Sequence, residues 1–410
     1  MARQPGDLRL EGQEIIISLK LLLKNLTWIR DEDLYTADIR IDGKKIVEIG
    51  DGLSPKRADK VIRFDNHYAY CGLTNSHDHL EMNLYQQSGN PPYHNYTAWA
   101  HDVYKPNESP VKEIEKIPIK FRLLWGGIKN LISGVTTVVH HNPWHYSLGN
   151  HFPVRVLKKY AWAHSLAFEK KLKSKFPIRK TTPFIIHAAE GRDSFARSEI
   201  DRLKKIGVLR ANTVLIHAVA VDDDEIDLIS QAGSSVVWCP SSNYYMFGQT
   251  AKISLLKERI PVALGTDSLM TGQSTLVQEM RVAKKSNEAT AKEIFEMVTS
   301  TPQKIFNLAR QKLAPGFPAD MVIVPIKSKD YYENLIFQES AEVTCVLVDG
   351  QVYYADESLA RVLSLKGFVQ KVGNVTKWFG DDVNQLKMNI LSTGIKEEFF
   401  EGNELWKFLS

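Results

Sequence analysis

Two histidines separated by one residue are the first sign of chemistry in this chain. The run "NSHDHLEMN" places His77 and His79 on either side of Asp78. Side chains two positions apart on a β-strand point to the same face, so both imidazoles can bind one ion while Asp78 points away. Imidazole nitrogen suits Zn²⁺ and Fe²⁺. Because strand histidines often only pack and hydrogen-bond, this hypothesis depends on further ligands.

Other apolar runs end in residues that can complete such a site. His187 closes "TPFIIH" and can supply a third nitrogen, and Asp267 closes "VALGTD" and can supply an oxygen. Three nitrogens and a carboxylate leave room for one water molecule, whose pKa an ion lowers from about 15.7 toward 7. Asp267 would then act as both ligand and proton acceptor. Glu190 is placed to shuttle a proton to the substrate, and His217 to polarise the attacked bond or steady the hydroxide.

The segments that must position these residues alternate strand-like and helix-like patterns. Seven apolar runs carry polar side chains at their ends: "YAYCGLTNSH", "GVTTVVHHN", "YAWAHSLAF", "TPFIIHAAEG", "NTVLIHAVA", "SSVVWCPSSN" and "IPVALGTDS". Amphipathic segments such as "IKFRLLWGGIKNLISG" and "DDDEIDLISQAG" lie between them. Strand followed by helix indicates a parallel α/β architecture, in which the carboxyl ends of the strands form the active-site face.

We therefore predict a (β/α)8 TIM-like barrel. Such a barrel needs about eight strands, and the missing one is expected between "YAWAHSLAF" and "TPFIIHAAEG". Only the basic segment "EKKLKSKFPIRK" lies there. The barrel is accordingly expected to be distorted around its fourth strand.

Both chain ends carry β-hairpin patterns. "ADIRIDGKKIVEIGDG" turns at Asp42-Gly43, and "AEVTCVLVDGQVYYAD" turns at Asp349-Gly350. Two hairpins at opposite ends can pair into one small β-sandwich domain beside the barrel. The predicted organisation is the N-terminal part of the sandwich at 1–66, the barrel at 67–318, the C-terminal part of the sandwich at 319–356, and a partly helical tail at 357–410.

Composition narrows the class of protein and its partners. Of the 410 residues, 43% are apolar and 24% are charged, which is ordinary for a globular protein. The net charge of +4 is too small to argue for nucleic acid or an anionic membrane as a partner. Three widely spaced cysteines suggest no disulfide framework, which favours a reducing cytosol. The apolar patch near the N-terminus is broken by Lys20 and Lys24 and is too short to span a membrane.

Six of the motifs together resemble one family. "NSHDHLEMN", "GVTTVV", "HAAEG", "VLIHAV", "VVWCPSSN" and "ALGTDS", in this order, are similar to the amidohydrolase superfamily and, within it, to the cytosine deaminase/triazine hydrolase branch. The resemblance implies one divalent ion, Zn²⁺ or Fe²⁺, on His77, His79, His187 and Asp267. It further implies Glu190 and His217 as the catalytic pair, a small-molecule substrate and a homodimer. No lysine stands at a strand end for the carboxylated bridge of two-metal relatives.

The predicted reaction is hydrolytic deamination of a nitrogen heterocycle by metal-bound hydroxide. Hydrolysis of a cyclic amide C–N bond or of a ring C–halide bond is an alternative, and a non-catalytic scaffold is a third. Cys239 has no second cysteine three residues on, which excludes the deaminases whose zinc is held by paired cysteines. The substrate itself is left open by the sequence.

The roles of several polar residues stay open at this level. His140 and His141 point to opposite faces of their strand, so at most one lines the site. His164 and Asn243 fit either the site or the core, and Arg192 fits contact with solvent better than contact with an anionic substrate. The aromatic stretch "HNYTAWAHDVY" at 94–104 fits a lid over a flat ring or ordinary packing between helices.

Overall fold

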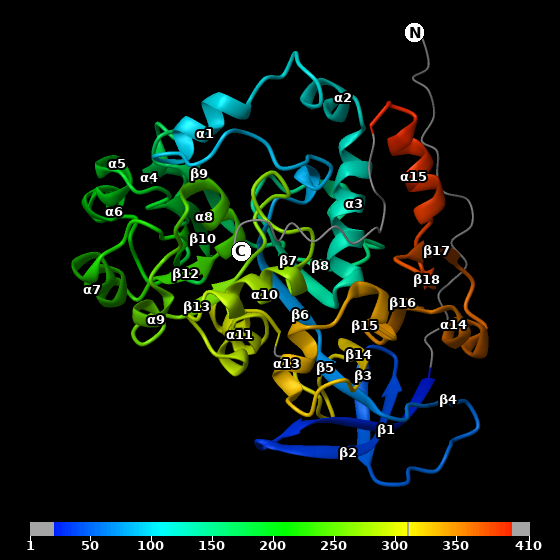
Figure 1. The fold of residues 1–410 in the computed structure, drawn as a ribbon. Helices are drawn as coiled ribbons and strands as arrows, with labels where there is room; N and C mark the ends of the chain where they lie inside the picture. Colours follow the sequence, from blue (N-terminus) through cyan, green and yellow to red (C-terminus); the bar gives the residue numbers. More distant parts are fainter. Residues whose placement is uncertain (1–19, 310, 396–410) are drawn as a thin grey trace.

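The computed structural model describes residues 20–309 and 311–395, and two groups of strands organise them (Figure 1). One group is parallel and comes from the middle of the chain. The other is a ten-stranded sheet to which both chain ends contribute. Residues 1–19 of the predicted N-terminal part of the sandwich and residues 396–410 of the predicted tail lie outside the described residues.

The parallel strands form two short sheets. Their bounds are β6 (Leu73–Asp78), β7 (Val135–His140), β8 (Arg155–Val156), β9 (Ala161–Ser165), β10 (Phe184–Ala188), β11 (Thr213–His217), β12 (Ser235–Trp238) and β13 (Val262–Leu264). The hydrogen-bonded orders are β6-β7-β8 and β13-β12-β11-β10-β9. A parallel bridge between Asp78 and Asp267 joins the β6 sheet to the chain just beyond β13. The predicted α/β architecture with parallel strands is confirmed.

The predicted place of the missing strand is wrong. Strand β9 pairs directly with β10, and the segment between them holds only the four-residue helix α4 (Leu172–Lys175). The strand that the sequence did not reveal is β8, which lies before β9 and pairs with β7. Only two residues of β8 are extended, so it has no apolar run that could mark it as a strand. The two parallel sheets are separated between β8 and β9, so the irregularity falls between the third and the fourth parallel strand.

Helices connect and flank these strands. Besides α4, those within residues 79–309 are α1 (Tyr96–Val103), α2 (Val111–Glu115), α3 (Ile119–Ile132), α5 (Ser194–Arg197), α6 (Glu199–Ile206), α7 (Asp223–Ala232), α8 (Pro240–Phe247), α9 (Ile253–Leu256), α10 (Leu276–Lys285), α11 (Ala291–Met297) and α12 (Ser300–Ile305). Helix α7 shows why the sequence ends them where it does. Asp222 and Glu225 form a capping box at its start, and Gly233 ends it with a φ of 69°.

The ten-stranded sheet combines the two ends of the chain. Its strands are β1 (Lys20–Arg30), β2 (Asp33–Asp42), β3 (Lys45–Gly50), β4 (Lys60–Arg63), β5 (His67–Cys71), β14 (Met321–Pro325), β15 (Cys345–Val348), β16 (Gln351–Asp356), β17 (Phe368–Val372) and β18 (Val375–Phe379). Both predicted hairpins are confirmed as the antiparallel pairs β2–β3 and β15–β16. Their turns meet, since a side chain at Gly350 would overlap the carbonyl oxygen of Gly43.

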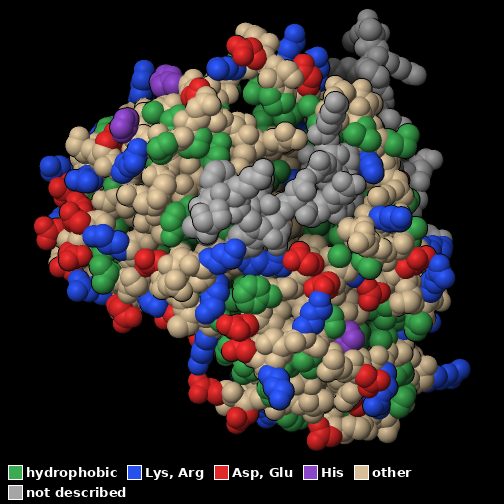
Figure 2. Space-filling model, in the orientation of Figure 1, with side chains coloured by type: hydrophobic (Ala, Val, Ile, Leu, Met, Phe, Trp, Pro, Cys, Tyr) green, Lys and Arg blue, Asp and Glu red, His purple; other side chains and the backbone are tan. Residues whose placement is uncertain are grey.

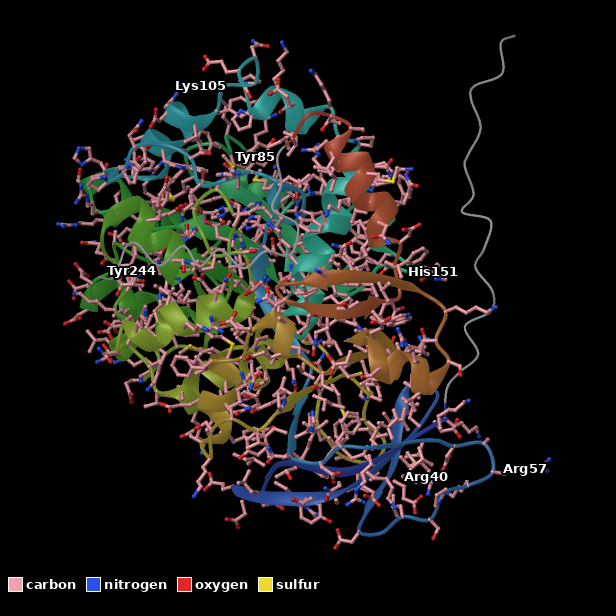
Figure 3. The ribbon with its side chains drawn as sticks, turned by 45° about the vertical axis from the view of Figure 1, so that its right-hand side comes forward. Arg40, Arg57, Tyr85, Lys105, His151 and Tyr244 are labelled. Atoms are coloured by element: carbon pink, nitrogen blue, oxygen red, sulfur yellow. The ribbon has the colours of Figure 1, made fainter. Side chains whose placement is uncertain are left out.

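The remaining helices and turns complete the described part of the chain. They are α13 (Tyr331–Ile336), α14 (Glu357–Leu363) and α15 (Val383–Leu391), with single 3-10 turns at Leu80–Met82, Tyr146–Leu148 and Ser340–Glu342. Helix α15 lies beside α3 (Figure 1). Figure 3 shows Arg40 within the N-terminal strands, where it is buried and pairs with Glu48 and Asp59, whereas Arg57 projects from the loop between β3 and β4.

One glycine links the two groups of strands and sets the position of β6. The chain leaves the large sheet at Cys71 and enters β6 at Leu73. A side chain at Gly72 between them would overlap Thr136 on β7, so the close approach requires glycine. Strand β6 is then buried along its whole length.

The surface and the cysteines carry few special features. Figure 2 shows basic and acidic side chains interspersed over the visible face. Cys71, Cys239 and Cys345 are free thiols. Among the described residues, no helix has the length and apolar character that crossing a membrane requires.

Candidate metal centre

A cluster of five imidazoles and one carboxylate lies at the carboxyl ends of the parallel strands. All six side chains are buried, and they come from His77, His79, His141, His187, His217 and Asp267. His77 Nε2 lies 3.3 Å from Asp267 Oδ1, and His79 Nε2 lies 3.5 Å from the same oxygen. The structure therefore brings together residues that are 190 positions apart in the sequence.

The ligand atoms of the cluster form two overlapping sets. In each set the atoms lie within 4.8 Å of one another, and the sets are His77, His79, His141 and His187, and His77, His187, His217 and Asp267. Each of the four predicted ligands belongs to at least one set. His77 and His187 belong to both, so the two sets surround one position rather than two separate ones.

Hydrogen bonds to oxygen acceptors orient two of the rings. His187 Nδ1 lies 2.8 Å from the carbonyl oxygen of His164, and His217 Nδ1 lies 2.9 Å from the amide oxygen of Asn243. These oxygens can only accept, so both Nδ1 atoms carry the proton and both Nε2 atoms keep a lone pair. Burial lowers the pKa of His217 to about 4, which keeps its imidazole neutral.

His141 orients His77 through a hydrogen bond between the two rings, and His141 is itself held by a carbonyl oxygen. Its Nε2 lies 3.1 Å from the carbonyl oxygen of Ala163 and must donate to it. Burial and the neighbouring histidines lower the pKa of His141 far below its ordinary value, so the ring is neutral and its Nδ1 can only accept. The partner of that Nδ1 is His77 Nδ1 at 3.3 Å. His77 Nε2 is thereby left with a free lone pair.

Two of these lone pairs have no partner in the protein. The Nε2 atoms of His77 and His217 are buried and make no hydrogen bond. Buried polar atoms are normally satisfied, and unpaired imidazole nitrogens beside a carboxylate are what a cation requires. This donor set fits a divalent metal ion, and Zn²⁺ suits it.

The carboxylate of Asp267 is held from behind. Its Oδ2 accepts hydrogen bonds from Ser242 at 2.7 Å and from Thr271 at 3.0 Å, which leaves Oδ1 facing His77 and His79. Burial by itself raises the pKa of this carboxyl, but the surrounding imidazoles hold the pKa well below its ordinary value. Asp267 is therefore ionised.

Backbone strain accompanies the cluster. Ala189, His217, Ala218 and Asp267 have φ values between 52° and 76°, a left-handed conformation that residues with a side chain seldom adopt. All four stand just after a strand or at its last residue. Such strain is typical of functional sites, where the surrounding structure holds side chains in one direction.

Glu190 lies beside the cluster, and its pKa is shifted in the opposite direction from that of Asp267. It is 4% exposed, and its Oε1 lies 3.5 Å from His217 Nε2. Burial raises its pKa well above the ordinary value, and the charges of Asp267 and Glu199 add to this effect. The surroundings of Glu190 therefore favour its protonated form, whereas those of Asp267 favour its ionised form.

The structure also decides the positions that the sequence left open. His141 joins the cluster, whereas His140 faces Glu81, 3.8 Å away. His164 is an exposed residue whose ring lies beside that of His187, with 5.0 Å between the ring centroids. Asn243 contacts His217, as described above. Arg192 Nε donates to the carbonyl oxygen of Tyr93 and lies outside the cluster.

Three contacts of the cluster were missed in the sequence. Ser242 and Thr271 support Asp267, and the amide of Asn142 lies 3.3 Å from His79 Nδ1. Ser242 stands beside Asn243 in "CPSSN" near the start of helix α8, whereas Asn142 and Thr271 lie outside helices and strands. Their sequence positions alone do not indicate which of them reach a buried site.

Comparisons with known proteins agree with this geometry. Residues 160–353 match the model of the amidohydrolase family. The 5-methylthioadenosine/S-adenosylhomocysteine deaminase of Pyrococcus abyssi is 22% identical over 85% of this chain and 96% of its own length. The 5'-deoxyadenosine deaminase of Methanosphaera stadtmanae is 24% identical, over 83% of this chain and 95% of its own.

Solved structures show a similar fold. The triazine hydrolase from Arthobacter aurescens aligns with a TM-score of 0.70 and 17% identity over 92% of this chain and all of its own. An adenosine deaminase from Xanthomonas campestris with bound zinc aligns with a TM-score of 0.63 and 15% identity, over 92% of this chain and 99% of its own.

Proposed function

We propose that this chain is a member of the amidohydrolase superfamily and a metal-dependent hydrolase that deaminates a nitrogen heterocycle. The observation that carries this proposal is the convergence of two unpaired, buried imidazole nitrogens, those of His77 and His217, on the carboxylate of Asp267, next to Glu190, whose pKa is raised by burial. The named deaminases among its relatives act on adenine-bearing compounds, as their names state. We therefore propose a ring that bears an exocyclic amino group as the substrate class.

We propose that His77, His79, His187 and Asp267 hold the ion, with Zn²⁺ expected and Fe²⁺ also suited to these ligands. A divalent ion at this place lowers the pKa of a water molecule from about 15.7 toward 7, so that a nucleophile is available at neutral pH. The carbonyl oxygen behind His187 and the His141 ring behind His77 keep the donor nitrogens pointing inward. This preorganisation is what tight binding of an ion requires.

The remaining residues move protons. Asp267 accepts the proton that the attacking water loses as its oxygen bonds to the ring carbon. Glu190 gives its proton to the ring nitrogen, which makes the ring carbon more electrophilic. Neutral His217, whose Nδ1 donates to Asn243, orients the attacking water by accepting a hydrogen bond from it at the Nε2 lone pair. Asp267 then passes the proton that it took from the water to the amino nitrogen, the C–N bond breaks, and ammonia leaves. The oxygen left on the ring carbon gives its remaining proton to Glu190, which restores the acid and leaves a carbonyl group.

Five further features go with this proposal: the barrel, the sandwich domain, the tail, the oligomeric state and the location. We propose that the eight parallel strands form a distorted (β/α)8 barrel within residues 67–318. The strands from 1–66 and 319–356 would form the β-sandwich domain, and 357–410 the tail. Strand β5 (67–71) pairs within the ten-stranded sheet, and the tail adds β17 and β18 to it. A homodimer and a cytosolic location are proposals from the resemblance and the cysteine usage.

Ammonia release tests the function. Protein of measured zinc content is incubated with 5-methylthioadenosine, S-adenosylhomocysteine, 5'-deoxyadenosine, cytosine, pterins and amino-triazines, and ammonia is quantified. We expect stoichiometric metal and turnover of at least one compound. A ring-opened acid without ammonia would favour the cyclic-amide reaction, and halide release from a chlorotriazine would favour the C–halide reaction. Absence of stoichiometric metal would refute the proposal and favour a scaffold.

A further inference from the structure

A second buried carboxylate lies close to Glu190 but outside the metal cluster. Glu199, the first residue of α6, is fully buried. Its Oε2 accepts a hydrogen bond from the backbone nitrogen of Ala189 at 2.8 Å, and its Oε1 accepts one from the hydroxyl of Tyr96 at 2.9 Å. Both oxygens are therefore engaged, one by the residue before Glu190 and the other by a residue about a hundred positions away.

Tyr96 contacts the same turn directly. It is the first residue of α1 and is 2% exposed. Its backbone nitrogen donates to the carbonyl oxygen of Glu190 at 3.2 Å, and its hydroxyl accepts from the backbone nitrogen of Ala167 at 3.1 Å. Tyr96 thus holds Glu190 by one bond of its own and by a second route through Glu199.

The chain before Tyr96 lies along the chain after Glu190. Asn95 and Gly191 form an antiparallel bridge, and Arg192 N donates to His94 O at 2.8 Å. A side chain at Gly191 would lie 2.7 Å from Asn95 Cβ, so the two segments are in close contact. The aromatic stretch at 94–104 is expected from its sequence to form either a lid over a flat ring or ordinary packing. Tyr96 fits ordinary packing, because its ring is buried against this turn.

The turn after β10 needs such support. Between His187 and Glu190 the chain passes through Ala189, whose φ of 52° is left-handed. An alanine in this conformation persists only where neighbouring groups hold it. The bond from Ala189 N to Glu199 and the bond from Tyr96 N to Glu190 O flank this strained point. They determine the direction in which the Glu190 side chain leaves the backbone.

We propose that Tyr96 and Glu199 are a positioning pair that holds the proton-donating carboxyl of Glu190 in place. The inference rests on the proposed function only in assigning the proton transfer to Glu190. It makes helix α1, which is not part of the metal centre, a determinant of the turnover rate. The pair would affect the chemical step and leave the metal ligands undisturbed.

The test compares Tyr96→Phe, Glu199→Gln and the double variant with wild type. Tyr96→Phe keeps the ring and removes only the hydroxyl. Displacement of a reacting group by about 1 Å costs on the order of 100-fold, so we expect kcat to fall by about that factor with KM within about threefold. The double variant should lose little more than the larger single loss, because both residues act through one contact. Zinc content should equal that of wild type.

A matched control variant shows whether loss of any buried hydroxyl lowers kcat. A second readout, which needs no substrate, measures the turn itself. Tyr354→Phe removes another buried hydroxyl, one bonded to Ser340 O at 2.8 Å in the ten-stranded sheet. It should leave kcat unchanged. Hydrogen–deuterium exchange of the peptide 184–193 should be faster in Tyr96→Phe than in Tyr354→Phe, with the α7 peptide 223–232 unchanged in both.

The outcomes separate this inference from the proposed function. A kcat of Tyr96→Phe equal to that of Tyr354→Phe, or unchanged exchange in 184–193, would overturn the positioning pair. A fall in kcat that merely follows a fall in zinc content would overturn it too. If Glu190→Gln retains full kcat, or if wild type releases no ammonia from the panel, the proposed function fails, while the exchange experiment still decides whether Tyr96 holds the turn.

Discussion

The two faces of strand β6 present opposite polar environments. On one face His77 points into the metal centre, where its Nε2 has no hydrogen-bond partner. On the other face Asp78 accepts bonds from Asn130 at 2.7 Å, Asn83 at 2.9 Å and Asn75 at 3.2 Å. His77 and Asp78 are adjacent in one strand, yet His77 lies in a cluster with unpaired polar atoms, whereas the carboxylate of Asp78 has its hydrogen-bond partners within the protein.

The difference separates a functional cluster from a structural one. The network around Asp78 ties β6 to α3 through Asn130, and to the chain before Asp267 through the bond from Asn75 to Thr266 at 2.8 Å. Burial raises the pKa of Asp78 to about 7 although the amides favour its ionised form. Its bonds are complete within the protein, so it needs no ligand. In the metal centre, the Nε2 atoms of His77 and His217 have no partner within the protein, so a bound ion can satisfy the site.

The same substitution made once in the metal centre, at Asp267, and once in the hydrogen-bonded network, at Asp78, tests this difference most directly. Asp267→Asn removes the charge that faces His77 and His79, whereas Asp78→Asn makes the same change in the satisfied network. We expect Asp267→Asn to lose stoichiometric zinc and to lose activity by about 10³-fold or more, because the ion contributes several kcal/mol. Asp78→Asn should keep its zinc. Metal analysis and ammonia release measure both, and equal zinc loss would contradict the distinction.

Within the metal centre, Glu190→Gln should separate proton transfer from metal binding. The substitution retains the size of the side chain but removes its acid function, and such groups contribute about 10²- to 10⁴-fold. We expect kcat to fall within that range with zinc content unchanged. Glu258→Gln, an exposed carboxylate beyond α9, is the control and should leave kcat unaltered. A Glu190→Gln enzyme with wild-type kcat would remove Glu190 from the mechanism.

The neighbours His141 and His140 test whether orientation of His77 matters. His141→Ala removes the acceptor of the His77 Nδ1 proton, and groups that orient a ligand in this way affect metal affinity by about 10- to 100-fold. His140→Ala removes a ring on the opposite face, so its zinc affinity should stay near that of wild type. Competition with a chromophoric chelator gives both affinities. Similar values for the two variants would contradict the relay through His141.

The smallest effect is expected in the satisfied network, and it should appear in stability. Asn130→Ala deletes donors to Asp78 and to the Gly126 carbonyl and leaves buried acceptors unpaired. We expect the free energy of unfolding to fall by about 1–3 kcal/mol, with zinc affinity nearly unchanged. Urea unfolding measures this loss. Asn384→Ala on the exposed side of α15 is the control and should change stability by less than about 0.5 kcal/mol.

Sequence reasoning was most successful where a pattern is local. Alternating apolar residues around Asp42-Gly43 and Asp349-Gly350 predicted both hairpins, and the apolar runs located seven of the eight parallel strands. It failed at β8, because two extended residues leave no periodicity. It also could not choose between His140 and His141, because alternation along a strand predicts opposite faces without indicating which one points inward.

By itself, the sequence determined the types of ligand and the strand ends that carry them, since hydrophobic periodicity and the His, Glu and Asp residues that follow it are local properties. Only the tertiary structure decided that His141 supports His77, that Ser242 and Thr271 orient Asp267, and that Tyr96 reaches Glu199. These contacts join segments between 4 and about 100 residues apart. Their geometry depends on how the strands pack side by side, which no single segment encodes.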